Sequence, residues 1–228
     1  MSPQTKRDNI SLASIRDRAA KTPYGIIFDC DGVLFDSKAA NTAFYNHIRA
    51  AVHLPPMTDE EATRSHMLAT QDAITCMVPP DLLQDALDVC KKTNYRDLFM
   101  DMMLPADHVY SFLQTMKARG IPLALCTNRT DSVHLVLRHF AMDSYFTPVM
   151  TITHVRPKPD AQGLTAITKI WDTSPDSVIF LGDSLVDQQS AINAGVPFWS
   201  FNNPDLTASV HVSGFKELED IVHLMLSS

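Results

Sequence analysis

Several features that mark whole classes of protein are missing from this chain. Its four cysteines include no CxxC pair, and its nine histidines form no HxH or HExxH pattern. No cysteine or histidine cluster therefore supports a zinc site. We expect the thiols to be reduced, as in a cytoplasm, with Cys30 and Cys126 as small buried residues.

Basic charge and long apolar stretches are also scarce. The chain has 19 Lys and Arg against 26 Asp and Glu, a net charge of −7, which is the wrong sign for a broad nucleic-acid surface. No apolar run approaches the length of a membrane span. The polar start MSPQTKRDNI lacks the apolar segment of a secretory signal. We expect a cytoplasmic protein, a monomer or homodimer, that binds neither nucleic acid nor membrane, although local cations could still hold a small anion.

The chain does have enough apolar residues for a full core. Its 228 residues are 45 % hydrophobic, which suits one large domain or one domain with a smaller insert. Apolar runs at residues 25–28, 121–126, 145–151, 178–181 and 197–201 alternate with helical patterns. This alternation predicts an α/β fold, a Rossmann-like parallel sheet with helices on both faces.

Polar motifs follow the predicted strands, at the edge of the sheet where ligands bind in such folds. Residues 24–37, YGIIFDCDGVLFDS, place Asp29 and Asp31 directly after the first strand. Alternating side-chain directions put the two carboxylates on the same side of the chain. Close carboxylates repel unless a cation lies between them or one is protonated. A simple polar turn is the alternative, and the other motifs argue against it.

Two later motifs favour phosphate. Thr127, Asn128 and Arg129 follow the second strand and are expected to begin a helix, whose N-terminus attracts anions. An ordinary helix cap is the simpler interpretation of this motif taken alone. Lys158, between two prolines in RPKP, offers a cation that offsets phosphoryl charge.

A further acidic motif, GDSLVD, follows the fourth strand and contains Asp183 and Asp187. Together with Asp29 and Asp31, Asp183 would complete a set of oxygen donors. Such a set suits Mg²⁺, which binds through a few carboxylates plus substrate phosphate.

The four motifs together resemble the haloacid dehalogenase superfamily of aspartate-nucleophile phosphatases and phosphotransferases. The resemblance covers residues 24–195 and rests on FDCDGVLFDS, CTNR, RPKP and GDSLVD followed by AINAG, in the expected order. The common form of the third motif has a proline where Ala161 stands. The alanine leaves the lysine in place but alters the expected loop.

This resemblance implies a role for each motif residue. Asp29 would be the nucleophile and a metal ligand, forming an aspartyl-phosphate. Asp31 would act as general acid and then base, with its backbone carbonyl also on the metal. Asp183 would complete the Mg²⁺ site, and Asp187 would either hold a metal-bound water or orient Lys158. The remaining motif residues would bind the phosphate: Thr127, Asn128, Arg129 and Lys158. Of these, Thr127 and Lys158 would also be catalytic.

A helix-rich stretch separates the first two motifs. Helices are predicted at residues 42–52, 58–77, from 79 onward, and 95–103. The layout resembles the helical cap of phosphoglycolate phosphatases and beta-phosphoglucomutases. It divides the chain into a core, residues 1–36 and 105–228, and a cap, residues 37–104. Alternatively, these helices simply cover one face of the sheet. Side chains that could contact substrate are Lys38, Asn41, Arg64, His66 and Gln71 in this stretch, and Arg129 and Arg156 outside it.

The expected function is a Mg²⁺-dependent phosphatase for a small phosphorylated metabolite, phosphoglycolate-like or sugar-phosphate-like, acting through an aspartyl-phosphate. The nearest alternative is a sugar-phosphate mutase on the same scaffold, followed by a non-catalytic binding module. A phosphonate hydrolase would need a Schiff-base lysine in the cap, where only Lys38 lies near the first motif. Haloacid dehalogenation is disfavoured, because Asp31 and the metal-building acids fit phosphoryl transfer.

Overall fold

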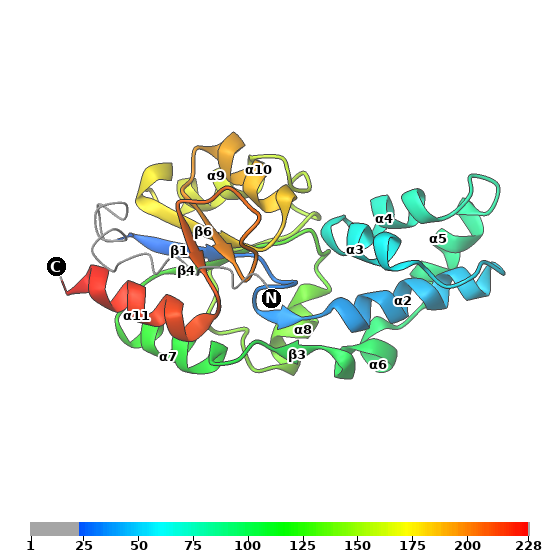
Figure 1. Ribbon diagram of the computed structural model, residues 1–228, viewed down its shortest axis with the longest axis horizontal. Coiled ribbons are helices and arrows are strands. Elements are labelled where there is room, and N and C mark those ends of the chain that lie inside the picture. Colours follow the sequence, from blue (N-terminus) through cyan, green and yellow to red (C-terminus); the bar gives the residue numbers. More distant parts are fainter. Residues whose placement is uncertain (1–22, 228) are drawn as a thin grey trace, which may run out of the picture.

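The structure is a computed structural model that describes residues 23–227. Six parallel strands form its sheet in the order β5-β4-β1-β6-β7-β8 (Figure 1). They are β1 (Gly25–Phe28), β4 (Leu123–Cys126), β5 (Val149–Met150), β6 (Val178–Gly182), β7 (Phe198–Phe201) and β8 (Val210–Val212). The predicted α/β parallel sheet is confirmed. Strand β8 was not predicted, β5 is shorter than predicted, and a helix predicted at residues 11–20 lies outside the described residues.

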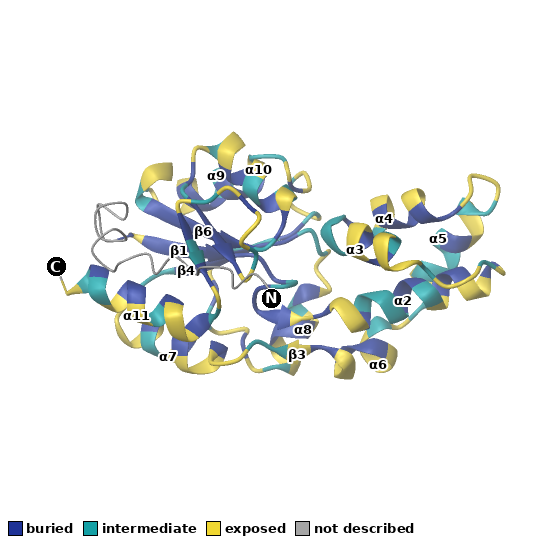
Figure 2. Ribbon diagram, in the orientation of Figure 1, coloured by how far each residue is buried: buried dark blue, intermediate teal, exposed yellow. Residues whose placement is uncertain are grey.

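Helices cover both faces of the sheet, and each face has its own apolar core. On one face lie α7 (Val109–Ala118), α8 (Val133–His139) and α11 (Phe215–Leu226), and on the other lie α9 (Gln162–Ile170) and α10 (Leu185–Ala194). The strands alternate between the cores, so Phe28 faces the first and Ile27 the second, both fully buried. Burying one such side chain contributes about 1.5–3 kcal/mol. The helices turn their buried sides inward (Figure 2), and the packed sheet holds its carboxyl ends in fixed positions.

A helical insert separates β1 from β4. It contains α2 (Lys38–Ala51), α3 (Asp59–Met67), α4 (Thr70–Met77), α5 (Leu83–Lys92), α6 (Tyr95–Phe99) and a 3₁₀ turn, Met100–Met102. Two short antiparallel strands, β2 (Phe35–Asp36) and β3 (Leu104–Pro105), pair where the insert leaves and rejoins the sheet region. The insert lies to one side of the sheet, to the right in Figure 1. Its assignment as a separate cap domain stays a prediction.

One predicted helix of the insert is divided in two. The predicted capping box is present, with the Glu61 N–H donating to Thr58 Oγ1 at 3.2 Å and the Thr58 N–H donating to Glu61 Oε2 at 2.8 Å. The single helix expected at 58–77 breaks because Leu68 and Ala69 adopt extended backbone angles. The break leaves the Met67 carbonyl available to accept a hydrogen bond from the loop after β4, at 3.4 Å.

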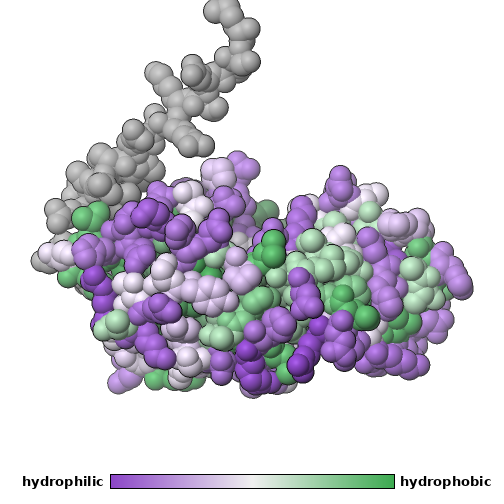
Figure 3. Space-filling view, turned by 90° about the horizontal axis from the view of Figure 1, so that it is seen from below, coloured by the Kyte–Doolittle hydropathy of each residue, from purple (hydrophilic) through white to green (hydrophobic). Residues whose placement is uncertain are grey.

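Apolar side chains also reach the outer surface of the insert and its junction with the sheet. Leu98, Met102 and Leu104 are all exposed, and the view from below shows apolar areas among polar ones over this part of the molecule (Figure 3). None of the three lines the cavity described below. Among the described residues, no helix is both long and apolar enough to cross a membrane.

Candidate active site

A buried lysine lies between two carboxylates at the carboxyl end of the sheet. Lys158 Nζ is 2.7 Å from Asp29 Oδ1 and 2.5 Å from Asp187 Oδ1, and the three side chains are 4 %, 10 % and 0 % exposed. Asp29 directly follows β1, Lys158 lies in the loop between β5 and α9, and Asp187 lies in the first turn of α10. Three separate elements therefore deliver one cation and two anions to a single buried point.

The charges in this cluster do not balance. Burial alone would lower the pKa of Lys158, but the carboxylates of Asp187 and Asp29 outweigh it and raise that pKa, so the lysine stays a cation. Burial raises the pKa of Asp29 to about 7, despite the nearby Lys158. Burial, with the carboxylates of Asp187 and Asp29, raises the pKa of Asp183 to about 8. One lysine is thus too little positive charge for three carboxylates.

A divalent cation would supply the missing charge. Ligand oxygens of Asp29, Asp183 and Asp187 all lie within 4.8 Å of one another. An all-oxygen set suits hard cations such as Mg²⁺. The residues present therefore fit the metal that the sequence implies. The cluster includes the side chain of Asp187 instead of that of Asp31, whose predicted metal ligand is its backbone carbonyl.

Two glycines allow this close packing of carboxylates. A Cβ added to Gly32, which has a φ of +78°, would lie 2.0 Å from Asp183 Oδ2. A Cβ added to Gly182 would lie 2.5 Å from the Cβ of Asp187. Any side chain at either position would push an acidic residue out of the cluster.

The Asp31 carboxylate is paired with an arginine. Arg129 Nε donates to Asp31 Oδ2 at 2.7 Å and Arg129 Nη2 donates to Asp31 Oδ1 at 2.6 Å, a bidentate pair with both side chains largely buried. The Ser37 hydroxyl also donates to Asp31. Burial raises the pKa of Asp31, but Arg129 outweighs it and holds this pKa well below its ordinary value. Arg129 thus offsets the charge of Asp31, and the predicted part of Asp31 in a metal site stays a prediction.

The other residues of the second motif hold the site together. Asn128 Oδ1 accepts the Lys158 N–H at 2.7 Å, and Asn128 Nδ2 donates to the Lys158 carbonyl at 3.2 Å and to the Met67 carbonyl at 3.4 Å. Thr127 is buried, and its hydroxyl accepts the Arg129 N–H at 3.1 Å. The expected helix N-terminus at this motif is wrong, because α8 begins only at Val133. Asn128 instead fixes the loop that contains Lys158 through hydrogen bonds to the backbone of that lysine.

The predicted site residues meet in one cavity of about 480 Å³ between the sheet and the insert. Asp29, Asp31, Thr127, Asn128, Arg129, Lys158 and Asp183 all line it, whereas Asp187 is fully buried behind Lys158. From the insert, the lining includes three of the side chains picked from the sequence, Asn41, His66 and Gln71.

Three cationic candidates lie outside the cavity lining. Lys38 donates to Thr63, Arg64 pairs with an exposed Glu60, and Arg156 pairs with Asp160 at 2.6 Å.

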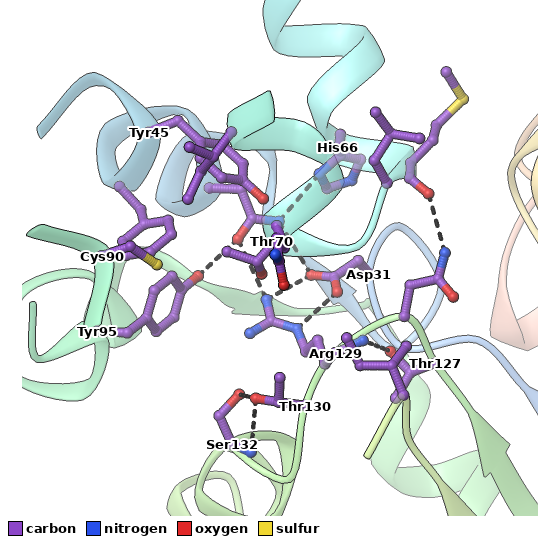
Figure 4. A pocket seen from close by; sticks show the side chains of 18 of the residues that line it. Asp31, Tyr45, His66, Thr70, Cys90, Tyr95, Thr127, Arg129, Thr130 and Ser132 are labelled. Atoms are coloured by element: carbon purple, nitrogen blue, oxygen red, sulfur yellow. Dashed lines mark hydrogen bonds and ion pairs between the residues drawn. The ribbon is translucent and has the colours of Figure 1, made fainter. Parts of the chain in front are cut away.

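Sequence reasoning missed Tyr95, whose ring lies 5.3 Å from the guanidinium of Arg129 (Figure 4). Its hydroxyl donates to Asn41 Oδ1 at 2.9 Å. No local motif marks this tyrosine, because 34 positions of sequence separate it from Arg129 and only folding brings them together. It belongs to the site through its place on α6.

Known proteins share both the sequence pattern and the fold. The model of the haloacid dehalogenase-like hydrolase family matches residues 26–201. The phosphoglycolate phosphatase of Agrobacterium fabrum is 29 % identical over 179 residues, covering 75 % of this chain and 77 % of that protein. The phosphorylated carbohydrates phosphatase of Thermotoga maritima is 24 % identical over 176 residues, covering 75 % and 81 %.

A solved structure agrees with these matches. A subfamily IA hydrolase of the same superfamily from Geobacter sulfurreducens is 34 % identical, with a TM-score of 0.75, and the match covers 86 % of this chain and 98 % of that one. The residues matched by the family model include all those that build the site. This chain therefore belongs to the haloacid dehalogenase-like hydrolase family.

Proposed function

We propose that this protein is a Mg²⁺-dependent phosphatase that hydrolyses a phosphate monoester with Asp29 as its nucleophile. One observation carries the proposal: the buried carboxylate of Asp29 lies 2.7 Å from Lys158, in a cluster whose acidic residues outnumber this one cation. A bound divalent metal would supply the missing positive charge and could then hold the phosphate as well. The named relatives, which are phosphatases of small phosphorylated compounds, support the same reaction.

In this mechanism a carboxylate oxygen of Asp29 attacks phosphorus, and the bond between phosphorus and the ester oxygen breaks. The product alcohol leaves with a proton from Asp31, and Asp29 carries the phosphoryl group. Water then attacks the phosphorus, gives its proton to Asp31, and releases phosphate with the Asp29 carboxylate restored. Lys158, oriented by Asp187, offsets the negative charge throughout.

Mg²⁺ would be held by Asp29, Asp183 and the Asp31 backbone carbonyl, and when bound it stabilises negative charge on the phosphoryl oxygens. The ion pair with Arg129 keeps Asp31 ionised in the resting state, which suits its role as base toward water. Protonation of a leaving alcohol requires this pair to open and Asp31 to take up a proton from solvent first. The phosphate group of the substrate would compete with Asp31 for Arg129 and so favour opening of the ion pair.

We also propose that residues 37–104 act as a cap over this site. Asn41 in the insert donates to Asp31 Oδ1 at 3.3 Å, and the Met67 carbonyl accepts from Asn128. The paired strands β2 and β3 form the short connection around which such a cap would turn. Structures with and without a phosphate analogue should then differ in the angle between insert and sheet.

The phosphatase proposal is tested with a panel of phosphate monoesters, with and without Mg²⁺, combined with rapid-quench detection of phosphoenzyme. Release of inorganic phosphate separates hydrolysis from isomer formation by a mutase. Asp29→Asn should lose turnover by about 10⁴–10⁶-fold and form no phosphoenzyme. Asp36→Asn, at an exposed position on β2, is the matched control and should retain activity. Full activity in excess chelator, or a phosphoenzyme in the Asp29 variant, would contradict the proposal.

A further inference from the structure

The cavity continues past the carboxylates into the space between the insert helices. Its lining there is mainly apolar and comes from four helices, α2, α4, α5 and α6. The side chains are Phe44, Tyr45, Ile74, Leu87, Cys90 and Tyr95. Figure 4 shows Tyr45, Cys90 and Tyr95 on the insert side of the cavity, facing the end that holds Asp31 and Arg129.

A polar layer separates this apolar part from the buried lysine. Tyr95 donates to Asn41 at 2.9 Å, Asn41 donates to Asp31 at 3.3 Å, and Arg129 Nη2 donates to Asn41 Oδ1 at 3.4 Å. Asn41 also contacts His66 at 3.2 Å. A substrate with its phosphate at Lys158 would pass this layer near its ester oxygen and then enter the apolar part.

Several polar groups of the apolar part are already paired, as the Tyr45 hydroxyl is with Thr70, or are exposed. The Thr93 hydroxyl donates to the Val89 carbonyl at 2.8 Å, and Gln71 and Lys91 are exposed. Burial raises the pKa of Tyr45 well above its ordinary value, as expected for a water-poor environment. A sugar would leave several hydroxyls there without partners, which is costly on burial.

The volume of the cavity also favours a substrate larger than a two-carbon acid. A cavity of about 480 Å³ lies within the range of about 300–1,000 Å³ that encloses drug-sized ligands. Phosphate and metal would occupy only the carboxylate end. A two-carbon acid such as glycolate would stop at the polar layer and leave the apolar part unfilled.

We propose, on the basis of the phosphatase function above, that the substrate is a phosphate monoester whose alcohol carries a bulky apolar group, an aliphatic chain or ring. The phosphate binds at Lys158 and the apolar group lies between α2, α4 and α5. The insert thus selects for hydrophobic leaving groups over glycolate and over sugars. The preference would arise because binding removes the apolar group of the substrate from water.

The first test is a series of n-alkyl phosphates from methyl to octyl, which keep a primary alcohol as leaving group while the apolar surface grows. The value of kcat/KM should rise about two- to fourfold per methylene until the cavity is full. Phosphoglycolate should be a poorer substrate than octyl phosphate. A flat series, or a preference for phosphoglycolate, overturns the inference.

Two leucines on α5 provide a matched pair of variants. Leu87 lines the cavity, whereas Leu83, one turn earlier and also half-buried, does not. Leu87→Gln should lower the ratio of kcat/KM for octyl over methyl phosphate about five- to tenfold, and Leu83→Gln should leave this ratio unchanged. Equal ratios in both variants and the parent, with circular dichroism showing folded proteins, would place the alkyl chain elsewhere and overturn the inference.

Binding separates this inference from the proposed reaction. Non-hydrolysable alkylphosphonates, titrated calorimetrically in the presence of Mg²⁺, should bind more tightly as the chain lengthens. If affinity rises but no ester is hydrolysed, the phosphatase function fails and the apolar site stands. If esters are hydrolysed but neither affinity nor kcat/KM rises with chain length, the phosphatase function stands and the apolar site is wrong.

Discussion

The two ends of the cavity differ in what holds them in place. At the sheet end, Asp29 and Lys158 are buried charges fixed by strand ends and by the hydrogen bonds of Asn128. At the insert end, the lining consists mainly of apolar and ring side chains such as Ile74 and Leu87 on separate helices. Buried charges need partners within hydrogen-bond distance, whereas apolar surfaces need only shape. We therefore expect the chemistry to take place at the sheet end, while the choice of substrate can vary with the side chains of the helices.

Ion pairs show the same contrast. Lys158 pairs with carboxylates in a setting where its side chain is 4 % exposed. Lys91 on α5 pairs with Asp88 at 3.3 Å, but the two side chains are 72 % and 48 % exposed. Water screens the second pair and not the first. The same substitution should therefore have a much larger effect at the buried lysine than at the exposed one.

After the loss of Asp29, the largest effect expected at the sheet end is the fall in turnover when Asp31 is replaced. Asp31→Asn removes the proton donor and acceptor but keeps the backbone carbonyl assigned to the metal. Turnover of an alkyl phosphate should fall about 10²–10⁴-fold, the usual contribution of general acid–base catalysis. A nitrophenyl phosphate should lose less in the first step, because its leaving group needs no proton.

The measurement is a rapid-quench comparison of the two esters on the same preparation, so that any change in folding affects both equally. Accumulated phosphoenzyme with the nitrophenyl ester would show that Asp31 is needed to activate water. Equal loss for both esters, with no intermediate, would contradict this role.

The next effect concerns stability. Lys158→Met keeps the length of the side chain but leaves Asp29, Asp183 and Asp187 without their cation. Breaking a buried pair in this way should lower the free energy of unfolding by about 3–5 kcal/mol. Lys91→Met, in the insert, should cost at most about 1 kcal/mol.

Urea unfolding of both lysine variants at neutral pH gives the comparison. Added Mg²⁺ should restore part of the stability of the Lys158 variant and leave that of the Lys91 variant nearly unchanged. Similar losses in the two variants would mean that the buried cluster does not depend on its lysine.

The sequence predicted the sheet end better than the insert end. Asp29, Thr127 and Asp183 each follow directly on a strand, so their meeting point follows from parallel topology alone. The pairing of Asp31 with Arg129 was missed, because 98 positions of sequence separate the two residues and only folding brings them together. The short strand β8 was also missed, since three residues with a half-exposed histidine give little apolar signal.

The apolar cavity could not be predicted, because no single helix contains it. The sequence predicted that the insert is built of helices, which does not say how those helices pack. Whether faces such as those of Phe44, Ile74 and Leu87 close on one another or leave a space between them depends on how the helices are placed. The break after Met67, which no proline or glycine marks, is part of that placement.

A smaller effect should appear in the pH dependence of stability without metal. The pKa values of Asp29 and Asp183 are raised from 3.8 to about 7 and about 8 in the folded protein. The folded state therefore binds more protons than the unfolded chain between about pH 4 and pH 8, and the free energy of unfolding falls as pH rises through this window. Each group contributes at most about 1.4 kcal/mol per pH unit. Asp31 acts oppositely, since Arg129 lowers its pKa, and its contribution is lost only in stronger acid.

Urea unfolding in chelator at several pH values from 5 to 9 measures this slope, and Asp183→Asn should reduce it. Mg²⁺ should reverse the loss at the alkaline end, because metal replaces the bound protons. Stability that rises with pH in the absence of metal would contradict the assignment of an acidic cluster short of positive charge.

The smallest effect is expected at Arg156, which the sequence offered as a side chain that could contact substrate. Its side chain is 70 % exposed and pairs with Asp160 on the surface, outside the cavity lining. Arg156→Met should therefore leave kcat and KM unchanged within error for every ester in the panel. Arg129→Met, the matched change inside the cavity, should raise KM and lower kcat, because it removes both a phosphate contact and the partner of Asp31. A rise in KM for the Arg156 variant, seen only with esters that carry a second negative charge, would show that this surface arginine reaches the substrate. Arg156 would then belong to the substrate-binding residues.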